Sequence, residues 1–303
     1  MFHDLEDDPV PTNEQRRQAA KRKLERQLER RAARARRRRQ LTVALSAVGV
    51  VLAVGVVALV VVLTRGNSSD AATSNDSSTP PTTSAAPASG AALPTVRKTP
   101  LPPTVDCTYP PGQPAAKPDN APPAGGVSAD GKIEATMATS AGDIGLTLDK
   151  AESPCTVNSF VSLAKQSYFD NTPCHRLVTD GIYVLQCGDP TGKGTGGPGY
   201  GFANEFPTDQ FGQGDAAAQQ PAIYPRGTIA MANSGQPGSN GSQFFLLYKD
   251  SPLPPQYTVF GTIDAPGLAV IEKIAAGGDD GSVSAGGGAP KTPVTITSMK
   301  VRT

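Results

Sequence analysis

Hydrophobic and polar residues alternate along the second half of the chain in a way that predicts mostly β-structure. From Lys132 the segment KIEATMAT, a turn at 140–143 and the segment IGLTL follow the period of two that strands show, which predicts a hairpin. Residues 229–247, IAMANSGQPGSNGSQFFLL, predict two short apolar strands joined by a turn rich in Gly, Asn, Pro and Ser. The C-terminal segment VTITSMKV predicts a further strand.

One segment of this region shows a helical period. After Pro154, which suits the first turn of a helix, the apolar residues Val157, Phe160, Val161 and Ala164 fall on one face. The pattern predicts a mainly β fold, a closed antiparallel barrel capped by helix, over residues 130–303. A segment of that length is long enough to bury one core.

A run of 23 residues without a charge, 41–63, predicts a transmembrane helix. A cleaved signal peptide is the alternative, but its apolar region is shorter and ends in small residues, whereas Thr64-Arg65 follows here. The arginines at 34–39 against the single Arg65 place the N-terminus in the cytoplasm and the C-terminus outside. We therefore expect a single-pass protein of the cell membrane whose C-terminal domain is extracytoplasmic.

The charge of the chain is unevenly distributed. The net charge is +1 overall, but residues 1–40 hold 13 Lys and Arg against 7 Asp and Glu. We interpret this basic tail as solvated surface or as a segment lying on anionic lipid. The sequence around it has no interleaved aromatic residues or nucleic-acid motif, so we expect no nucleic-acid partner.

Residues 64–129 are rich in Pro, Ser, Thr and Ala, as in SSTPPTTSAAPASG. Such a composition buries too little apolar surface to offset the entropy of ordering, so we predict a disordered linker. At random-coil scaling it would reach roughly 40 to 50 Å. The folded domain would then stand away from the membrane.

All four cysteines, Cys107, Cys155, Cys174 and Cys187, follow the apolar run, and an even number in an oxidising space favours disulfides. Three connectivities are open, of which we favour Cys155–Cys174, which flank the predicted helix, with Cys107–Cys187 as the second bond. No Cys-x-x-Cys spacing is present and the only histidines are His3 and His175, so we expect no metal site and no cofactor.

Two other kinds of site are weakly indicated. The segment GDPTGKGTGG is similar to a phosphate loop, but Lys193 precedes Gly194 where Ser or Thr is required, and no helical pattern follows. His175 has no nucleophile-elbow serine to pair with in a hydrolase, so we expect a structural histidine that is buried and hydrogen-bonded.

Three motifs in order, CHRLVTDGIYVLQCGD at 174–189, MAN at 231–233 and NGSQFF at 240–245, resemble the cyclophilin family of peptidyl-prolyl cis-trans isomerases. The resemblance covers about residues 130–303 and implies a cyclophilin-like β-barrel with capping helices. Alanine- and arginine-rich composition favours an actinobacterial source.

The resemblance assigns roles by motif. Arg176 takes the place of the catalytic arginine, and Gln186, the second catalytic residue, that of a donor to the substrate backbone. The substrate-binding residues that it implies are Tyr183, Val184, Ala232, Asn233, Ser234, Gln243, Phe245, Leu253 and Tyr257. Two residues are inserted between Arg176 and Tyr183 relative to the usual family spacing.

Two positions depart from the family pattern. Pro252 stands where many members have a tryptophan that contacts cyclosporin, and Tyr257 replaces a pocket histidine. The chain has no tryptophan at all, so we expect weak cyclosporin binding.

The chemistry that the resemblance implies needs no covalent step. Rotation about a peptide bond faces a barrier of about 18–20 kcal/mol because the nitrogen lone pair is delocalised into the carbonyl. A guanidinium that donates to the pyramidalised prolyl nitrogen localises that lone pair and lowers the barrier. We expect a monomeric isomerase that binds proline-containing polypeptides and assists folding as a chaperone does. The alternatives are a Pro-peptide binding module without catalysis and a surface-display domain.

Overall fold

The computed structural model describes residues 90–212 and 215–302 of the chain. Within them no helix has the length and apolar character that crossing a membrane requires. The predicted basic tail 1–40, the predicted transmembrane helix 41–63 and the first part of the predicted linker lie outside the described residues. The elements are β1 (Ala91–Ala92), β2 (Thr104–Val105), β3 (Val127–Ser128), β4 (Lys132–Thr139), β5 (Gly142–Asp149), α2 (Pro154–Lys165), β6 (Thr172–Pro173), β7 (Arg176–Val178), β8 (Val184–Cys187), the 3-10 turns η1 (Thr208–Gln210) and η2 (Ala216–Gln219), β9 (Ala222–Tyr224), β10 (Thr228–Met231), β11 (Phe244–Leu247), β12 (Ser251–Leu253), β13 (Val259–Ile263), α3 (Ala265–Ala276) and β14 (Thr295–Val301).

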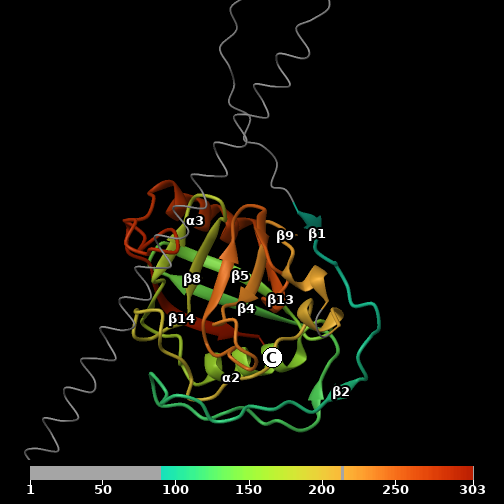
Figure 1. Cartoon of the computed structure of the whole chain (residues 1–303). Coiled ribbons are helices and arrows are strands. Elements are labelled where there is room, and N and C mark those ends of the chain that lie inside the picture. Colours follow the sequence, from blue (N-terminus) through green and yellow to red (C-terminus); the bar gives the residue numbers. More distant parts are fainter. Residues whose placement is uncertain (1–89, 213–214, 303) are drawn as a thin grey trace, which may run out of the picture. The chain divides into compact units, whose positions relative to one another are not determined.

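Nine of the strands form one antiparallel sheet in the order β6-β14-β4-β5-β13-β10-β11-β8-β7. The sheet curls strongly, so its strands run at steep angles to one another in the view of Figure 1. Its two edge strands, β6 and β7, are consecutive in the chain, yet no ladder joins them among the described strands. The mainly β prediction is confirmed, whereas the sheet forms a curled half-barrel and its hydrogen bonds do not close the predicted barrel.

The predicted hairpin is the pair β4 and β5, in register from Lys132 opposite Asp149 to Thr139 opposite Gly142. Alternate residues of each strand point into the core, where Met137, Ile144 and Leu148 have no exposed surface. The alternation of the sequence therefore corresponds directly to the buried and solvent-facing sides of the sheet.

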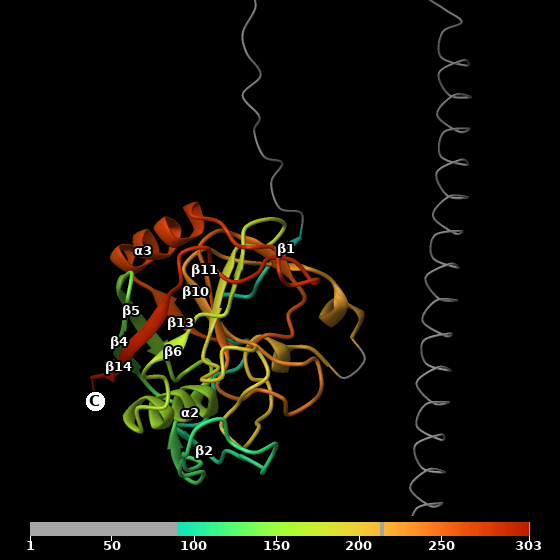
Figure 2. The same ribbon diagram turned by 90° about the vertical axis from the view of Figure 1, so that its left-hand side faces the viewer.

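Two helices cover opposite ends of the sheet (Figures 1 and 2). α2 is the predicted helix, and its first turn donates backbone N–H bonds from Cys155 and Thr156 to the buried carboxylate of Glu205, at 3.0 and 2.7 Å. α3 was not predicted. It starts after Asp264, whose carboxylate accepts a bond of 2.7 Å from the N–H of Gly267.

A second, smaller sheet supports the outer side of the curled sheet. Its order is β1-β9-β12, and β1 pairs in parallel with β9. Leu93, which follows β1, packs in one apolar cluster with Val184, Tyr224, Phe245 and Leu247. The side chains of this cluster underlie the site described below.

The predicted linker is wrong for residues 90–129, which are ordered against the body. Figure 1 shows this segment running along the outside from β1 to β2. Arg97 forms an ion pair of 2.7 Å with Asp209, and its Nε donates to the carbonyl of Glu152 at 3.0 Å. Long-range bonds of this kind replace the apolar burial that the composition lacks, which is why composition alone misplaced the boundary.

The favoured disulfide connectivity is also wrong. The bonds are Cys107–Cys155 and Cys174–Cys187, with Cα atoms 5.5 and 4.0 Å apart. Cys155 lies in the first turn of α2 and faces the segment at Cys107, while Cys174 lies between β6 and β7 beside the neighbouring strand β8. The sequence did not reveal these partners because Cys107–Cys155 joins the N-terminal segment to α2, and Cys174–Cys187 joins positions that the pairing of β7 with β8 brings together.

Candidate active site

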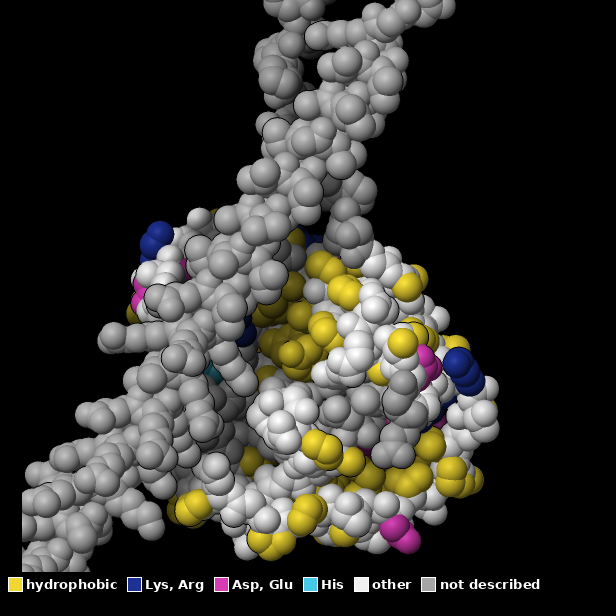
Figure 3. Space-filling model, in the orientation of Figure 1, with side chains coloured by type: hydrophobic (Ala, Val, Ile, Leu, Met, Phe, Trp, Pro, Cys, Tyr) yellow, Lys and Arg dark blue, Asp and Glu magenta, His cyan; other side chains and the backbone are white. Residues whose placement is uncertain are grey.

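A groove made of two adjoining hollows lies over β7, β8, β10 and β11. The first, of about 160 Å³, we call the apolar pocket; the second, of about 600 Å³, we call the polar pocket. They share Gln186, Ala232 and Asn233 as a common wall. Figure 3 shows hydrophobic side chains gathered in a hollow on one face of the molecule. The apolar pocket is lined by Arg176, Ile182, Val184, Gln186, Ala232, Asn233, Phe245, Leu253 and Tyr257.

Arg176 stands on β7, half-buried, directly opposite Gln186 of β8. Its Nε and Nη2 both donate to the carbonyl of Gly286, at 3.1 and 3.0 Å, and Nη1 lies 3.5 Å from Oε1 of Gln186. A guanidinium has five N–H donors in a fixed plane. The carbonyl of Gly286 therefore fixes the plane of the Arg176 guanidinium. The second N–H of Nη1 stays free to donate to a group in the pocket.

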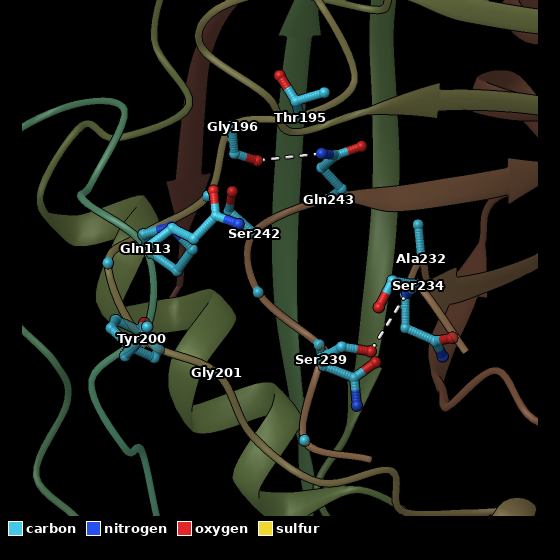
Figure 4. Close-up of a pocket in the computed structure, with 18 of the residues that line it drawn as sticks. Gln113, Thr195, Gly196, Tyr200, Gly201, Ala232, Ser234, Ser239, Ser242 and Gln243 are labelled. Carbon is cyan, nitrogen blue, oxygen red and sulfur yellow. Dashed lines mark hydrogen bonds between the residues drawn. The ribbon is translucent and has the colours of Figure 1, made fainter. Parts of the chain in front are cut away.

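The amide of Gln186 is oriented by a chain of hydrogen bonds. Its Nε2 donates to Oε1 of Gln243 at 3.0 Å, and Nε2 of Gln243 donates to the carbonyl of Gly196 at 3.0 Å. The second of these bonds is drawn in Figure 4. Because each amide is fixed by the next, Gln186 presents its oxygen and not its nitrogen to Arg176.

The floor of the apolar pocket corrects the sequence assignment. Ile182, Val184 and Gln186 line it. These residues are spaced two apart, and side chains at this spacing lie on the same face of an extended chain. Tyr183 points to the other face, with its ring 5.9 Å from that of Tyr248. The predicted role of Tyr183 is therefore wrong, and counting back in twos from Gln186 would have found Ile182.

The opposite wall of the apolar pocket is aromatic. The rings of Phe245 and Tyr257 meet edge to face at 5.5 Å, and Phe245 is 6% exposed. The hydroxyl of Tyr224 holds this wall by donating to the carbonyl of Tyr257 at 3.0 Å. Leu253 completes the wall.

Asn233 occupies the edge between the two pockets. Its side-chain nitrogen donates to the carbonyl of Gln256 at 2.8 Å, and its side-chain oxygen accepts from the N–H of Gly235 at 2.9 Å. The side chain is thus engaged in supporting the loop. In the part of the chain that the structure describes, the main chain of Asn233 makes no backbone hydrogen bond, which leaves it available to an extended peptide.

Ser234 and Gln243 line the polar pocket and not the apolar one. The N–H of Ser234 donates to the hydroxyl of Ser239 at 3.2 Å, as Figure 4 shows. The structure also brings Gly112, Gln113 and Pro114 to this pocket. Sequence reasoning missed them because they lie in the segment predicted to be disordered.

The glycine-rich loop after β8 is built around Asp189. Its carboxylate accepts backbone N–H bonds from Thr191, Thr195 and Gly196, at 2.7, 3.0 and 3.0 Å. Burial alone would raise the pKa of Asp189, but these hydrogen bonds lower it below its usual value. The Asp189 carboxylate therefore already accepts hydrogen bonds from the backbone N–H groups that a bound phosphate would need.

His175 lies beside this loop, and neither of its ring nitrogens has a hydrogen-bond partner among the described residues. Burial lowers the pKa of His175, and the nearby Arg176 adds to this effect, against the opposing charge of Asp189. The residue is half-buried, and the hydrogen bond expected of a structural histidine is missing among the described residues, so that part of the prediction is wrong. Across residues 90–212 and 215–302 no group of three His, Cys, Asp or Glu side chains is arranged to hold a metal ion.

Comparisons with known proteins agree with the kind of site that the geometry indicates. Residues 134–301 match the model of the cyclophilin type peptidyl-prolyl cis-trans isomerase/CLD family. The chain is 59% identical to a probable peptidyl-prolyl cis-trans isomerase B of Mycobacterium leprae, covering 96% of this chain and 100% of that protein. It is 56% identical to the corresponding protein of Mycobacterium tuberculosis, covering 96% and 94%.

Among solved structures, a Cryptosporidium parvum cyclophilin type peptidyl-prolyl cis-trans isomerase is similar, with 27% identity and a TM-score of 0.46 over 57% of this chain and 99% of that one. The family model covers more than half of the chain and includes Arg176, Gln186 and both walls of the apolar pocket. The chain belongs to the cyclophilin-type peptidyl-prolyl cis-trans isomerases and has the activity of that family.

Proposed function

We propose that Arg176 catalyses the rotation of X-Pro bonds by donating a hydrogen bond to the prolyl nitrogen as it becomes pyramidal. The observation that carries this proposal is the orientation of its guanidinium, which two bonds to the carbonyl of Gly286 and one contact with Gln186 fix at the rim of the apolar pocket. A preorganised donor needs little rearrangement at the transition state. Each tenfold of rate requires about 1.4 kcal/mol of such preferential stabilisation.

The proline ring occupies the apolar pocket between Val184 and Phe245. The pocket volume of about 160 Å³ suits a small apolar ring, and most of its lining is aliphatic or aromatic, with polar groups from Arg176, Gln186 and Asn233. The flanking peptide runs along Asn233, whose main-chain groups pair with it, into the polar pocket. This arrangement uses strand pairing for affinity and leaves side-chain selection to the pockets.

Isomerisation of short X-Pro peptides tests the catalytic role. We expect Arg176→Ala to lower kcat/KM by about 100- to 1,000-fold, the loss typical for one preorganised donor. Arg226→Ala is a matched control because Arg226 pairs with Glu272 on the surface, away from both pockets. Equal rates for wild type and Arg176→Ala would remove the mechanism.

We further propose that the domain works outside the cytoplasm on the folding of secreted client proteins, anchored by residues 41–63. The length of that uncharged run, the arginines before it and the use of all four cysteines in disulfides support this placement. Protease added to intact spheroplasts should digest residues 90–303 and spare an epitope at the N-terminus. Protection of the domain under these conditions would contradict the proposal.

Cyclosporin should bind weakly. Pro252 stands in β12 opposite Ile223, next to the pocket residue Leu253, so no indole group is present to donate to the ligand or cover it. Nanomolar inhibition of the purified protein would contradict this expectation.

A further inference from the structure

Residues 107–117, which we call the arm, are bound tightly to the body at both ends. At its start, Cys107 is joined to Cys155 of α2, and the hydroxyl of Tyr109 donates to the carbonyl of Cys155 at 2.7 Å. At its end, the ammonium group of Lys117 donates to the carbonyl of Tyr168 at 3.0 Å, just after α2. The arm is therefore a fixed part of the folded domain.

Between these ends the arm pairs with the loop at 197–201. Gly112 donates its N–H to the carbonyl of Gly199, and Ala116 donates to that of Gly197, both at 2.8 Å. Gly199 has a φ of +79°, and a Cβ there would lie 3.1 Å from the Cβ of Ala115. A glycine at 199 thus allows both the turn and the close approach of the arm.

This pairing brings Gly112, Gln113 and Pro114 to the rim of the polar pocket, across from Gln243. Figure 4 shows Gln113 and Gln243 among the residues that surround the hollow. Gln113 is exposed, so its amide is open to a ligand. The pocket therefore has one wall that comes from outside the region matched by the family model, residues 134–301.

The chemistry of the polar pocket is neutral. The side chains around it are amides, hydroxyls, one phenol, two prolines and an alanine, with many glycines, and no Asp, Glu, Lys, Arg or His is among the described residues that line it. A charged side chain entering would lose water without gaining a partner of opposite charge. A neutral side chain with both donor and acceptor groups would find matching partners.

We propose that Gln113 determines substrate specificity by hydrogen bonding a neutral polar side chain of the peptide, such as glutamine, near the isomerised proline. The inference rests on the proposed binding of an X-Pro peptide along Asn233. Because the pockets share Ala232 and Asn233 as a wall, the selected residue lies close to the proline along the extended peptide.

Peptide selectivity of the full chain tests this role. Two series of X-Pro peptides carry Gln, Leu or Glu two positions before or two positions after the proline. In at least one series, wild type should use the Gln peptide with a kcat/KM about 3- to 10-fold above that of the Leu and Glu peptides, the effect of one neutral hydrogen bond. Gln113→Ala should abolish the preference for Gln over Leu by raising KM, with kcat unchanged.

Gln219→Ala serves as the matched control, because Gln219 is exposed and lies in neither pocket. Cys107→Ser/Cys155→Ser, which frees the start of the arm, should weaken the same preference. Unchanged selectivity of Gln113→Ala in both series, with normal activity, overturns the inference and leaves the isomerase mechanism intact. Loss of activity on every peptide only in Arg176→Ala supports the mechanism independently of Gln113.

Discussion

Arg176 and Gln186 face each other across β7 and β8, with Nη1 of the guanidinium 3.5 Å from the side-chain oxygen of Gln186. The strand register sets this pair, and Gln243 sets which atom of the Gln186 amide points to the arginine. The donor proposed for catalysis is thus held by one loop carbonyl and one amide oxygen. Disturbing either support should reduce the rate without unfolding the protein.

Gln243→Leu removes the acceptor for the Gln186 nitrogen, so the Gln186 amide can turn and present its donor to Arg176. We expect kcat to fall about 3- to 10-fold, as for the loss of one neutral hydrogen bond, with a smaller change in KM. Single-turnover isomerisation of a peptide without side chains beyond Ala and Pro measures the effect. Gln220→Leu, an exposed change outside both pockets, is the control. An unaltered kcat for Gln243→Leu would argue against a positioning role.

Ile182→Ala and Tyr183→Ala distinguish the two possible floors of the apolar pocket. Ile182 lines the pocket, whereas Tyr183 packs beside Tyr248. We expect Ile182→Ala to raise KM for X-Pro peptides several-fold, because apolar surface that contacts the proline is lost. Tyr183→Ala should lower the free energy of unfolding and leave KM unchanged at a temperature where the variant is folded. The reverse pattern would restore the assignment made from family spacing.

The two disulfides should act on different properties. They span 48 and 13 positions, for which the chain-entropy model gives about 4 and about 3 kcal/mol of stability. Replacing Cys174 and Cys187 by alanine should also lower kcat, because Cys187 adjoins Gln186 and Cys174 lies two residues before Arg176. Replacing Cys107 and Cys155 should leave kcat for short peptides unchanged. Urea unfolding and peptide isomerisation of both double variants, compared under oxidising conditions, check this division.

Stability should fall as the pH drops below the ordinary pKa of histidine. Burial holds the pKa of His175 below the ordinary value for histidine, so the unfolded chain takes up this proton before the folded one does. The stability contributed by a neutral His175 is complete above pH 6.5 and is lost as the pH falls through the lower, folded-state pKa. The loss is at most about 1.4 kcal/mol per pH unit for one proton. Urea midpoints of wild type and His175→Asn between pH 5 and 8 measure it, and parallel pH profiles would contradict it.

The sequence by itself determined the elements whose pattern is local. The alternation in 132–149 and the helical period after Pro154 arise from which side of each element is buried, and both elements formed where expected. The helix α3 has similar signals, an N-cap Asp264 and apolar Leu268, Ile271 and Ile274 at helical spacing, which the Pro-Gly pair in its first turn concealed. The motifs around Arg176 and Asn233 also located the groove.

Only the tertiary structure decided which distant segments meet. Cys107 joins Cys155, the arm completes the polar pocket and Gly286 orients Arg176, and each relationship crosses 48 or more positions of sequence. Composition misjudged residues 90–129 because few of their side chains, such as Leu93, are buried, and most of their order comes from a disulfide, ion pairs and backbone bonds to partners elsewhere. Local patterns report the burial of a residue, but they do not report its partner.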